Sequence, residues 1–240
     1  GVLKEYIQRD QLDRRDAALA ARLCYGVLQN RSKLDYYVNQ LLTGKGKTLH
    51  PVIRDILHLG LYQIYELDKI PESAAVNESV ALAKKYCKKQ QFAPGLVNGV
   101  LRNAVRTKGQ LREPRDWEVL YSHPKKLVDL LKANVGSQKL EPMLKANNAM
   151  PQTVVQVNTL KTTREALAAA LAEENVACAP HEWMENCLVL SGTGNLEELK
   201  AFRDGLFYVQ DAGAKLSVLC ARIPENANVL DCCAAPGGKS

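Results

Sequence analysis

The sequence lacks any hydrophobic run that approaches the length of a membrane span, and it does not begin with a signal peptide. Its seven cysteines are an odd number and include no CxxC pair with metal-ligand spacing, and its four histidines are scattered along the chain. We therefore expect a cytoplasmic protein with no membrane association and no metal site. We also expect reduced cysteines that are mostly small, buried hydrophobic side chains.

The C-terminal segment carries the most informative pattern of the chain. Val229 and Leu230 predict a short strand, which ends at Asp231 and leads into a tight loop of small residues. Pro236 fixes one φ angle and Gly237 can adopt a positive φ, so that backbone N–H groups can approach a ligand closely. Strand-to-loop corners of this kind are where open α/β sheets bind ligands.

Two common phosphate-binding patterns are absent from this loop. A Walker loop would need a glycine at position 233, where the chain has Cys233, and the dinucleotide pattern Gly-x-Gly-x-x-Gly is missing as well. A P-loop ATPase is therefore disfavoured. A glycine-rich turn that binds no ligand remains an alternative.

Residues 1–107 carry apolar side chains at helical spacing throughout and predict an all-α bundle with short loops. Five helices are expected, over about 17–28, 34–42, 51–67, 74–89 and 94–105. Residues 108–150 read as a helical linker, whose two helices are expected over 125–134 and 137–147.

After Met150 the pattern changes to alternating strands and helices. Strands over 154–157 and 187–190, with helices over 163–174 and 196–202, predict a small α+β subdomain of the split βαβ type over 151–205. Residues 206–240 then read as the start of a further domain. Its first strand precedes a helix, and Asp211 fits the N-cap of that helix.

Positive charge is concentrated in the first part of the chain. Residues 1–107 contain 17 Lys and Arg against 10 Asp and Glu, whereas residues 151–205 contain 4 against 8. A basic surface suits nucleic acid, although a solvated helical surface would have the same composition. The candidate contacts to RNA phosphates are Arg14, Arg15, Arg22, Arg31, Lys84, Lys85, Arg102 and Arg106.

Several segments resemble known families. Residues 23–28, 59–64, 74–78 and 94–102 resemble the NusB fold, a small helical RNA-binding module. Residues 229–240 resemble motif I of the RNA cytosine-C5 methyltransferases, which bind S-adenosylmethionine. Together, the two resemble the RsmB (Sun/Fmu) family of 16S ribosomal RNA cytosine-C5 methyltransferases. This resemblance implies a multidomain protein: a NusB-like bundle, a small RRM-like α+β unit and a Rossmann-like, S-adenosylmethionine-dependent methyltransferase domain.

The family also implies a site and a mechanism. The backbone of the loop would line the methionine and ribose side of the cofactor, through Cys233, Ala234, Ala235, Pro236, Gly237, Gly238 and Lys239. A cysteine thiolate would add to C6 of the target cytosine, and family enzymes carry this cysteine in a Thr-Cys-Ser-like motif. A second cysteine assists release from a Pro-Cys-Ser-like motif.

Neither cysteine motif occurs in these residues, so we assign catalysis to none of the seven cysteines. We expect the chain to be a truncated, inactive portion of a monomeric enzyme that acts on ribosomal RNA. The alternatives are a transfer-RNA substrate and a non-enzymatic NusB-like RNA-binding or antitermination module.

Overall fold

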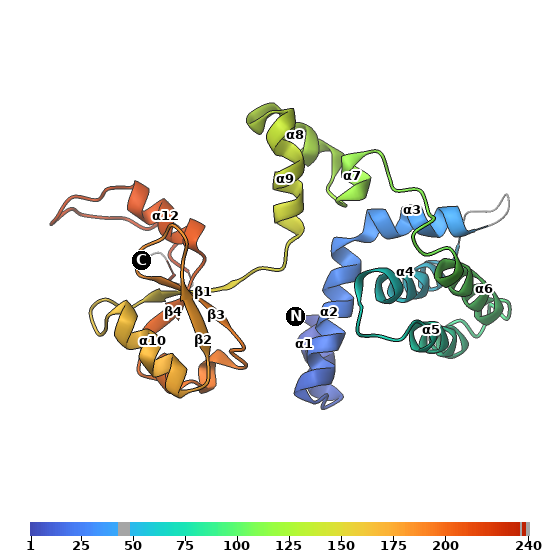
Figure 1. Cartoon of the computed structure of the whole chain (residues 1–240), viewed down its shortest axis with the longest axis horizontal. Coiled ribbons are helices and arrows are strands. Elements are labelled where there is room, and N and C mark those ends of the chain that lie inside the picture. Colours follow the sequence, from blue (N-terminus) through green and yellow to red (C-terminus); the bar gives the residue numbers. More distant parts are fainter. Residues whose placement is uncertain (43–48, 236, 239–240) are drawn as a thin grey trace. The chain divides into compact units, whose positions relative to one another are not determined.

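The computed structural model describes residues 1–42, 49–235 and 237–238. The chain divides into two compact units, Gly1–Ala149 and Met150–Ser240, each of which is treated separately below (Figure 1). In the described part of the chain, no helix combines the length and the apolar character needed to cross a bilayer.

The first unit is entirely helical. Its first six helices are α1 (Val2–Arg9), α2 (Arg14–Gln29), α3 (Arg31–Leu41), α4 (Pro51–Glu66), α5 (Glu72–Tyr86) and α6 (Ala93–Arg106). Local signals account for their starts. The side chain of Asp13 accepts a hydrogen bond from the Asp16 backbone N–H at 2.8 Å and caps α2. Pro51 begins α4, where a missing N–H has no cost.

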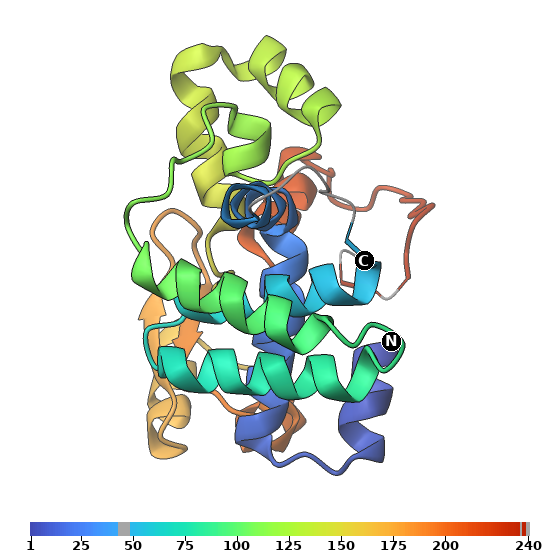
Figure 2. The same ribbon diagram turned by 90° about the vertical axis from the view of Figure 1, so that its right-hand side faces the viewer.

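Helix α4 lies at the centre of this unit and contacts α2, α3, α5 and α6. Its Ile53, Leu57 and Leu61 are fully buried, together with Leu34 of α3 and Leu101 of α6. Each such side chain stabilises the fold by about 1.5–3 kcal/mol relative to an exposed one. Helices α5 and α6 pack side by side, as Figure 2 shows.

Three further helices complete the unit: α7 (Trp117–Leu120), α8 (Lys125–Val135) and α9 (Ser137–Asn148). The expected limits of the two longer ones agree with the structure to within one residue. They enclose a separate small cluster of Val128, Leu140 and Leu144.

The second unit is a four-stranded antiparallel sheet with helices. Its elements are β1 (Thr153–Val157), α10 (Arg164–Glu173), β2 (Ala177–Pro180), β3 (Cys187–Ser191), a short 3-10 turn (Leu196–Glu198), α11 (Lys200–Arg203), β4 (Phe207–Val209) and α12 (Ala212–Cys220). The strand order is β2-β3-β1-β4. Val155, Leu167, Leu171, Leu188 and Phe207 form its core.

The structure differs from the sequence-based expectation at three strands, of which β2 was not expected at all. β4 pairs with β1, opposing Phe207 to Val157 and Val209 to Val155, so the sheet extends past residue 205. The strand expected at Val229 and Leu230 is wrong: both residues lie in an irregular segment and are 61% and 84% exposed. A strand forms only when another strand satisfies its backbone groups, and no described strand pairs with this segment.

The expectation that most cysteines are buried is also wrong. Only Cys87 and Cys187 are buried, whereas Cys220, Cys232 and Cys233 are exposed. The last two lie in the irregular segment that follows α12, where the described chain provides no core to cover them.

Candidate functional site

The glycine loop predicted to hold a cofactor is exposed and shaped by local hydrogen bonds. The Cys233 backbone N–H donates to Oδ1 of Asp231 at 2.9 Å, and the Gly237 N–H donates to the carbonyl of Ala234 at 2.5 Å. Gly237 has a φ of 97°, which the sequence anticipated and which disfavours other residues. Of the seven predicted cofactor residues, Pro236 and Lys239 lie outside the described residues.

Gln210 connects this loop to the sheet. Its side chain is 8% exposed, and its Nε2 donates to the carbonyl of Gly238. The backbone carbonyl of Gln210 accepts a hydrogen bond of 3.2 Å from Nε2 of the buried Gln156 in β1. The chain Gln156–Gln210–Gly238 therefore ties the loop to β1, a central strand of the sheet, and Oε1 of Gln210 has no hydrogen-bond partner among the described residues.

The next residue, Asp211, has a structural role. Its Oδ2 accepts a hydrogen bond of 2.8 Å from the Gly213 N–H, so it caps α12 as the sequence predicted. Among the described residues, no group of three His, Cys, Asp or Glu side chains is arranged to hold a metal ion.

All eight basic residues predicted to contact RNA are exposed, on four different helices. Arg14, Arg15 and Arg22 belong to α2, Arg31 begins α3, Lys84 and Lys85 belong to the last turn of α5, and Arg102 and Arg106 belong to α6. Exposure makes each available to a phosphate, and the last two line a common pocket.

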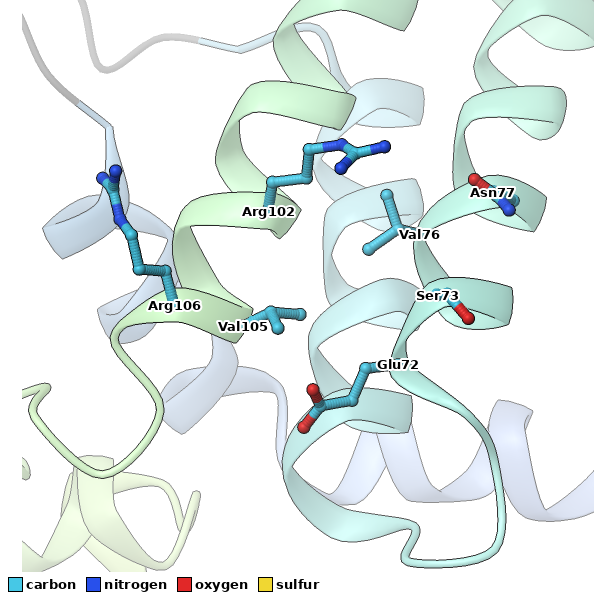
Figure 3. Close-up of a pocket in the computed structure, with 7 residues that line it drawn as sticks. All are labelled: Glu72, Ser73, Val76, Asn77, Arg102, Val105 and Arg106. Carbon is cyan, nitrogen blue, oxygen red and sulfur yellow. The ribbon is translucent and has the colours of Figure 1, made fainter.

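That pocket is a groove of about 410 Å³ between α5 and α6 (Figure 3). Val76, which is buried, and Val105 form its apolar floor. Arg102 extends across the groove toward α5, whereas Arg106, which also lines the groove, directs its guanidinium away from α5 (Figure 3). The remaining lining residues belong to the first part of α5: Glu72, Ser73 and Asn77.

The hydrogen bonds around the groove determine its charge. Glu72 accepts a hydrogen bond from Nζ of Lys108 at 2.9 Å, which offsets its negative charge. Nε of Arg102 donates to Oδ1 of Asn98 at 2.9 Å, and this bond orients the guanidinium. The groove thus combines an apolar floor with a net positive rim.

Sequence reasoning missed the α5 side of the groove. Ser73 and Asn77 are four residues apart on one helix, as Arg102 and Arg106 are on the other, and such pairs share a helix face. This spacing indicates that Ser73 and Asn77 lie on the same face of α5. It does not identify a binding site, because exposed Ser and Asn residues are common on helices and the groove exists only where α5 packs on α6.

Two protein families match large parts of the chain. Residues 2–106 match the NusB family, and residues 123–197 match the ferredoxin-like domain of Methyltr_RsmF/B-like proteins. The chain therefore belongs to the class of proteins in which a NusB-type helical domain precedes this ferredoxin-like domain.

Curated relatives extend the similarity to nearly the whole chain. The chain is 34% identical over 235 residues to ribosomal RNA small subunit methyltransferase B of Pseudomonas putida, covering 97% of this chain and 53% of that protein. Identity to the proteins of the same name is 33% over 239 residues in Pectobacterium carotovorum and 34% over 235 residues in Vibrio cholerae. These matches cover 98% and 97% of this chain and 54% and 53% of the relatives.

The resemblance to the RsmB family is thereby confirmed, and the chain spans about half the length of the curated relatives it matches. The crystal structure of PH0851 is also similar, with a TM-score of 0.66 and 18% sequence identity over 98% of this chain and 54% of that one. At this identity the likeness shows a shared fold.

Proposed function

We propose that the protein containing this chain methylates C5 of a cytosine in 16S ribosomal RNA, with S-adenosylmethionine as the methyl donor, and works in the cytoplasm. The observation that carries the proposal is the order of a NusB-type and an RsmF/B-type domain, together with 34% identity along 97% of the chain to a ribosomal RNA small subunit methyltransferase.

The first unit would hold the RNA. Its eight exposed basic residues would contact phosphates, which positions the substrate without reading its sequence. The target base would have to be unpaired or flipped out to reach a catalytic site.

The glycine loop would hold the donor. Residues 233–238 fit this role because they carry no large side chain, and a Cβ built on Gly237 meets no atom within 4 Å, so the backbone is open to a ligand. The loop residues would orient the donor through their N–H groups, and Gln210 would fix the loop through Gly238. The donor supplies the methyl group, as cofactors supply the reactive chemistry in such enzymes.

The nucleophile would belong to the half of the relatives' length that this chain does not span. Its thiolate would add to C6 of cytosine and so make C5 nucleophilic, and C5 would bond to the methyl carbon that the donor supplies. A base would then remove the C5 proton, and the thiolate would leave C6.

The test is methyl transfer by the full-length protein to small-subunit RNA, with labelled S-adenosylmethionine and sequencing after bisulfite treatment to locate C5-methylated cytosine. We expect label in that RNA and a bisulfite-resistant cytosine, and no transfer by the 240-residue chain alone. Methylation of adenine, or of transfer RNA in preference to ribosomal RNA, would contradict the proposal.

A further inference from the structure

We propose that the groove between α5 and α6 binds one unpaired nucleotide of an RNA strand, with its base on the apolar floor and its phosphate at Arg102. This inference deepens the RNA-binding part of the proposed function and rests on it. It assigns a binding site to a particular pocket, where the basic surface alone would predict only general attraction to phosphates.

The floor of the groove suits a base. Val76 and Val105 present apolar surface at its bottom, and Ser73 and Asn77 place a hydroxyl and an amide on the opposite rim (Figure 3). A base is flat and apolar on its faces and polar at its edges, so it fits a cavity with this distribution. Sequence-specific proteins recognise RNA mainly through unpaired bases, because side chains cannot read the deep, narrow major groove of the A-form helix.

The volume supports a single nucleotide. About 410 Å³ lies near the lower end of the range of about 300–1,000 Å³ that small-ligand pockets occupy. A pocket of this size has room for one base and its sugar but not for a base pair in a duplex.

The charge of the rim supports a phosphate at Arg102. Nε of Arg102 already donates a hydrogen bond to Oδ1 of Asn98. The two terminal amino groups of Arg102 have no hydrogen-bond partner among the described residues. They are therefore free to form the paired hydrogen bonds that arginine makes to phosphate oxygens. The acid in the groove, Glu72, is already paired with Lys108 and repels the phosphate less than a free carboxylate would.

The chain offers a matched control for Arg102. Arg22 of α2 carries the same charge and is likewise exposed, but it does not line the groove. Removing either charge lowers the general attraction to RNA by the same amount. Only the loss of Arg102 removes a contact inside the groove.

The experiment measures binding of the 240-residue chain to a labelled 12-nucleotide unstructured RNA and to the same sequence in a duplex, at several salt concentrations. We expect Arg102→Gln to weaken binding to the single strand about fivefold or more and to reduce the salt slope by about 1. Arg22→Gln should weaken it less than half as much. Equal effects of the two substitutions would overturn the proposal.

A second variant fills the groove without changing its charge. Ser73 is exposed in the first turn of α5, so Ser73→Trp should leave the helical core intact, which a thermal melt followed by circular dichroism checks. We expect it to weaken binding to the single strand about tenfold and to leave duplex binding unchanged, because stacking of one base is worth this order of affinity. Unchanged single-strand binding by a folded Ser73→Trp protein overturns the inference.

The outcome is separable from that of the proposed function. Methyl transfer by the full-length protein is measured independently, so the groove can fail while methylation of ribosomal RNA holds. Conversely, single-strand binding at the groove can be measured on this chain even if the full-length protein methylates another RNA.

Discussion

Gly26 marks the closest approach between two helices of the first unit. A Cβ built at this position of α2 would lie 2.0 Å from Cζ of the Tyr62 ring in α4. No side chain fits at that distance without moving the ring, which is itself only 8% exposed. The glycine is therefore required by packing, even though glycine is unfavourable in a helix interior.

Gly26→Ala should destabilise the chain by about 1–3 kcal/mol, as overpacked core substitutions do. Gly99 provides the control because it also lies inside a helix, α6, and a Cβ built there meets no atom within 4 Å. Gly99→Ala should therefore stabilise the chain by about 0.5–1 kcal/mol. Urea unfolding of both variants gives the comparison. If both substitutions changed the free energy of unfolding in the same direction, the contact between α2 and α4 would be looser than described.

His58 is a buried, titratable side chain of α4 in the first unit. It is 1% exposed in α4, and its Nε2 lies 3.0 Å from Oδ1 of Asp35, which also accepts a hydrogen bond of 2.6 Å from Arg54. Burial, the largest effect, lowers the pKa of His58 below its ordinary value of about 6.5, against the opposing attraction of Asp35 and Asp55.

This shift predicts a pH dependence of stability. Below about pH 6.5 the unfolded chain binds a proton at His58 that the native state resists, so stability falls as the pH falls, and is unaffected above that value. In His58→Gln the side chain no longer titrates, and the loss of stability between pH 7.5 and about 5.5 should be smaller than in the unsubstituted chain. Urea midpoints at the two pH values measure it, and identical losses would contradict the assignment.

At the scale of elements, one carboxylate joins two helices of the second unit. Oε2 of Glu174, the C-cap residue of α10, accepts a hydrogen bond of 2.7 Å from the backbone N–H of Lys200, and its Oε1 accepts one of 3.0 Å from that of Ala201. These are the first N–H groups of α11, which lack partners within the helix. The two backbone hydrogen bonds lower the pKa of Glu174.

Glu174→Gln should destabilise the second unit by about 1 kcal/mol or less, since the amide can accept only one of the two bonds. The lowered pKa means that the carboxylate stabilises the fold at neutral pH and that this effect is lost as the pH falls below about 4.3. The difference between the two proteins should therefore shrink in acid. Glu173→Gln is the matched control, because this neighbouring carboxylate is exposed and should give no change at either pH.

Elements with a clear internal signal could be predicted from the sequence, and those defined by distant partners could not. Helices α2 to α6, α8 and α9 of the first unit followed from apolar spacing, whereas α1 and α7 were not among the expected helices. Helix α10 followed from its cap at Thr163, whose Oγ1 accepts the Ala166 N–H. β2 gave no such signal because it is short, mostly exposed and ends in Pro180; it exists because β3 supplies its hydrogen bonds. Val229 has the composition of a strand but no described partner.

Some features of the candidate site could likewise be predicted from the sequence, and others could not. The glycine loop and the basic residues of the first unit are visible as residue types, so the sequence indicated them. The contact between Gln210 and Gly238 joins residues 28 positions apart, and the groove requires α5 and α6 to pack in a particular register. Both depend on tertiary packing, which periodicity does not encode.

At the scale of the whole molecule, each unit has a core of its own. The two clusters of the first unit draw on residues up to Leu144, and the two of the second begin at Val154. The basic excess belongs to the first unit, whereas the glycine loop belongs to the second. In the proposed function, RNA binding and donor binding therefore fall to separately stabilised parts of the chain.

The pairing of β4 with β1 has a practical consequence for anyone who shortens this protein. A recombinant product ending at residue 205 would lose Phe207, which is 3% exposed and whose ring centroid lies 5.6 Å from that of Phe202. It would also leave the edge of β1 that faces β4 without a hydrogen-bonding strand. The unpaired backbone groups of an exposed edge strand can pair with another chain. We therefore expect the product ending at residue 205 to self-associate, and a product ending at residue 220 to stay monodisperse. Light scattering on the two purified products would distinguish them, and a monodisperse shorter product would mean that β4 is dispensable to the sheet.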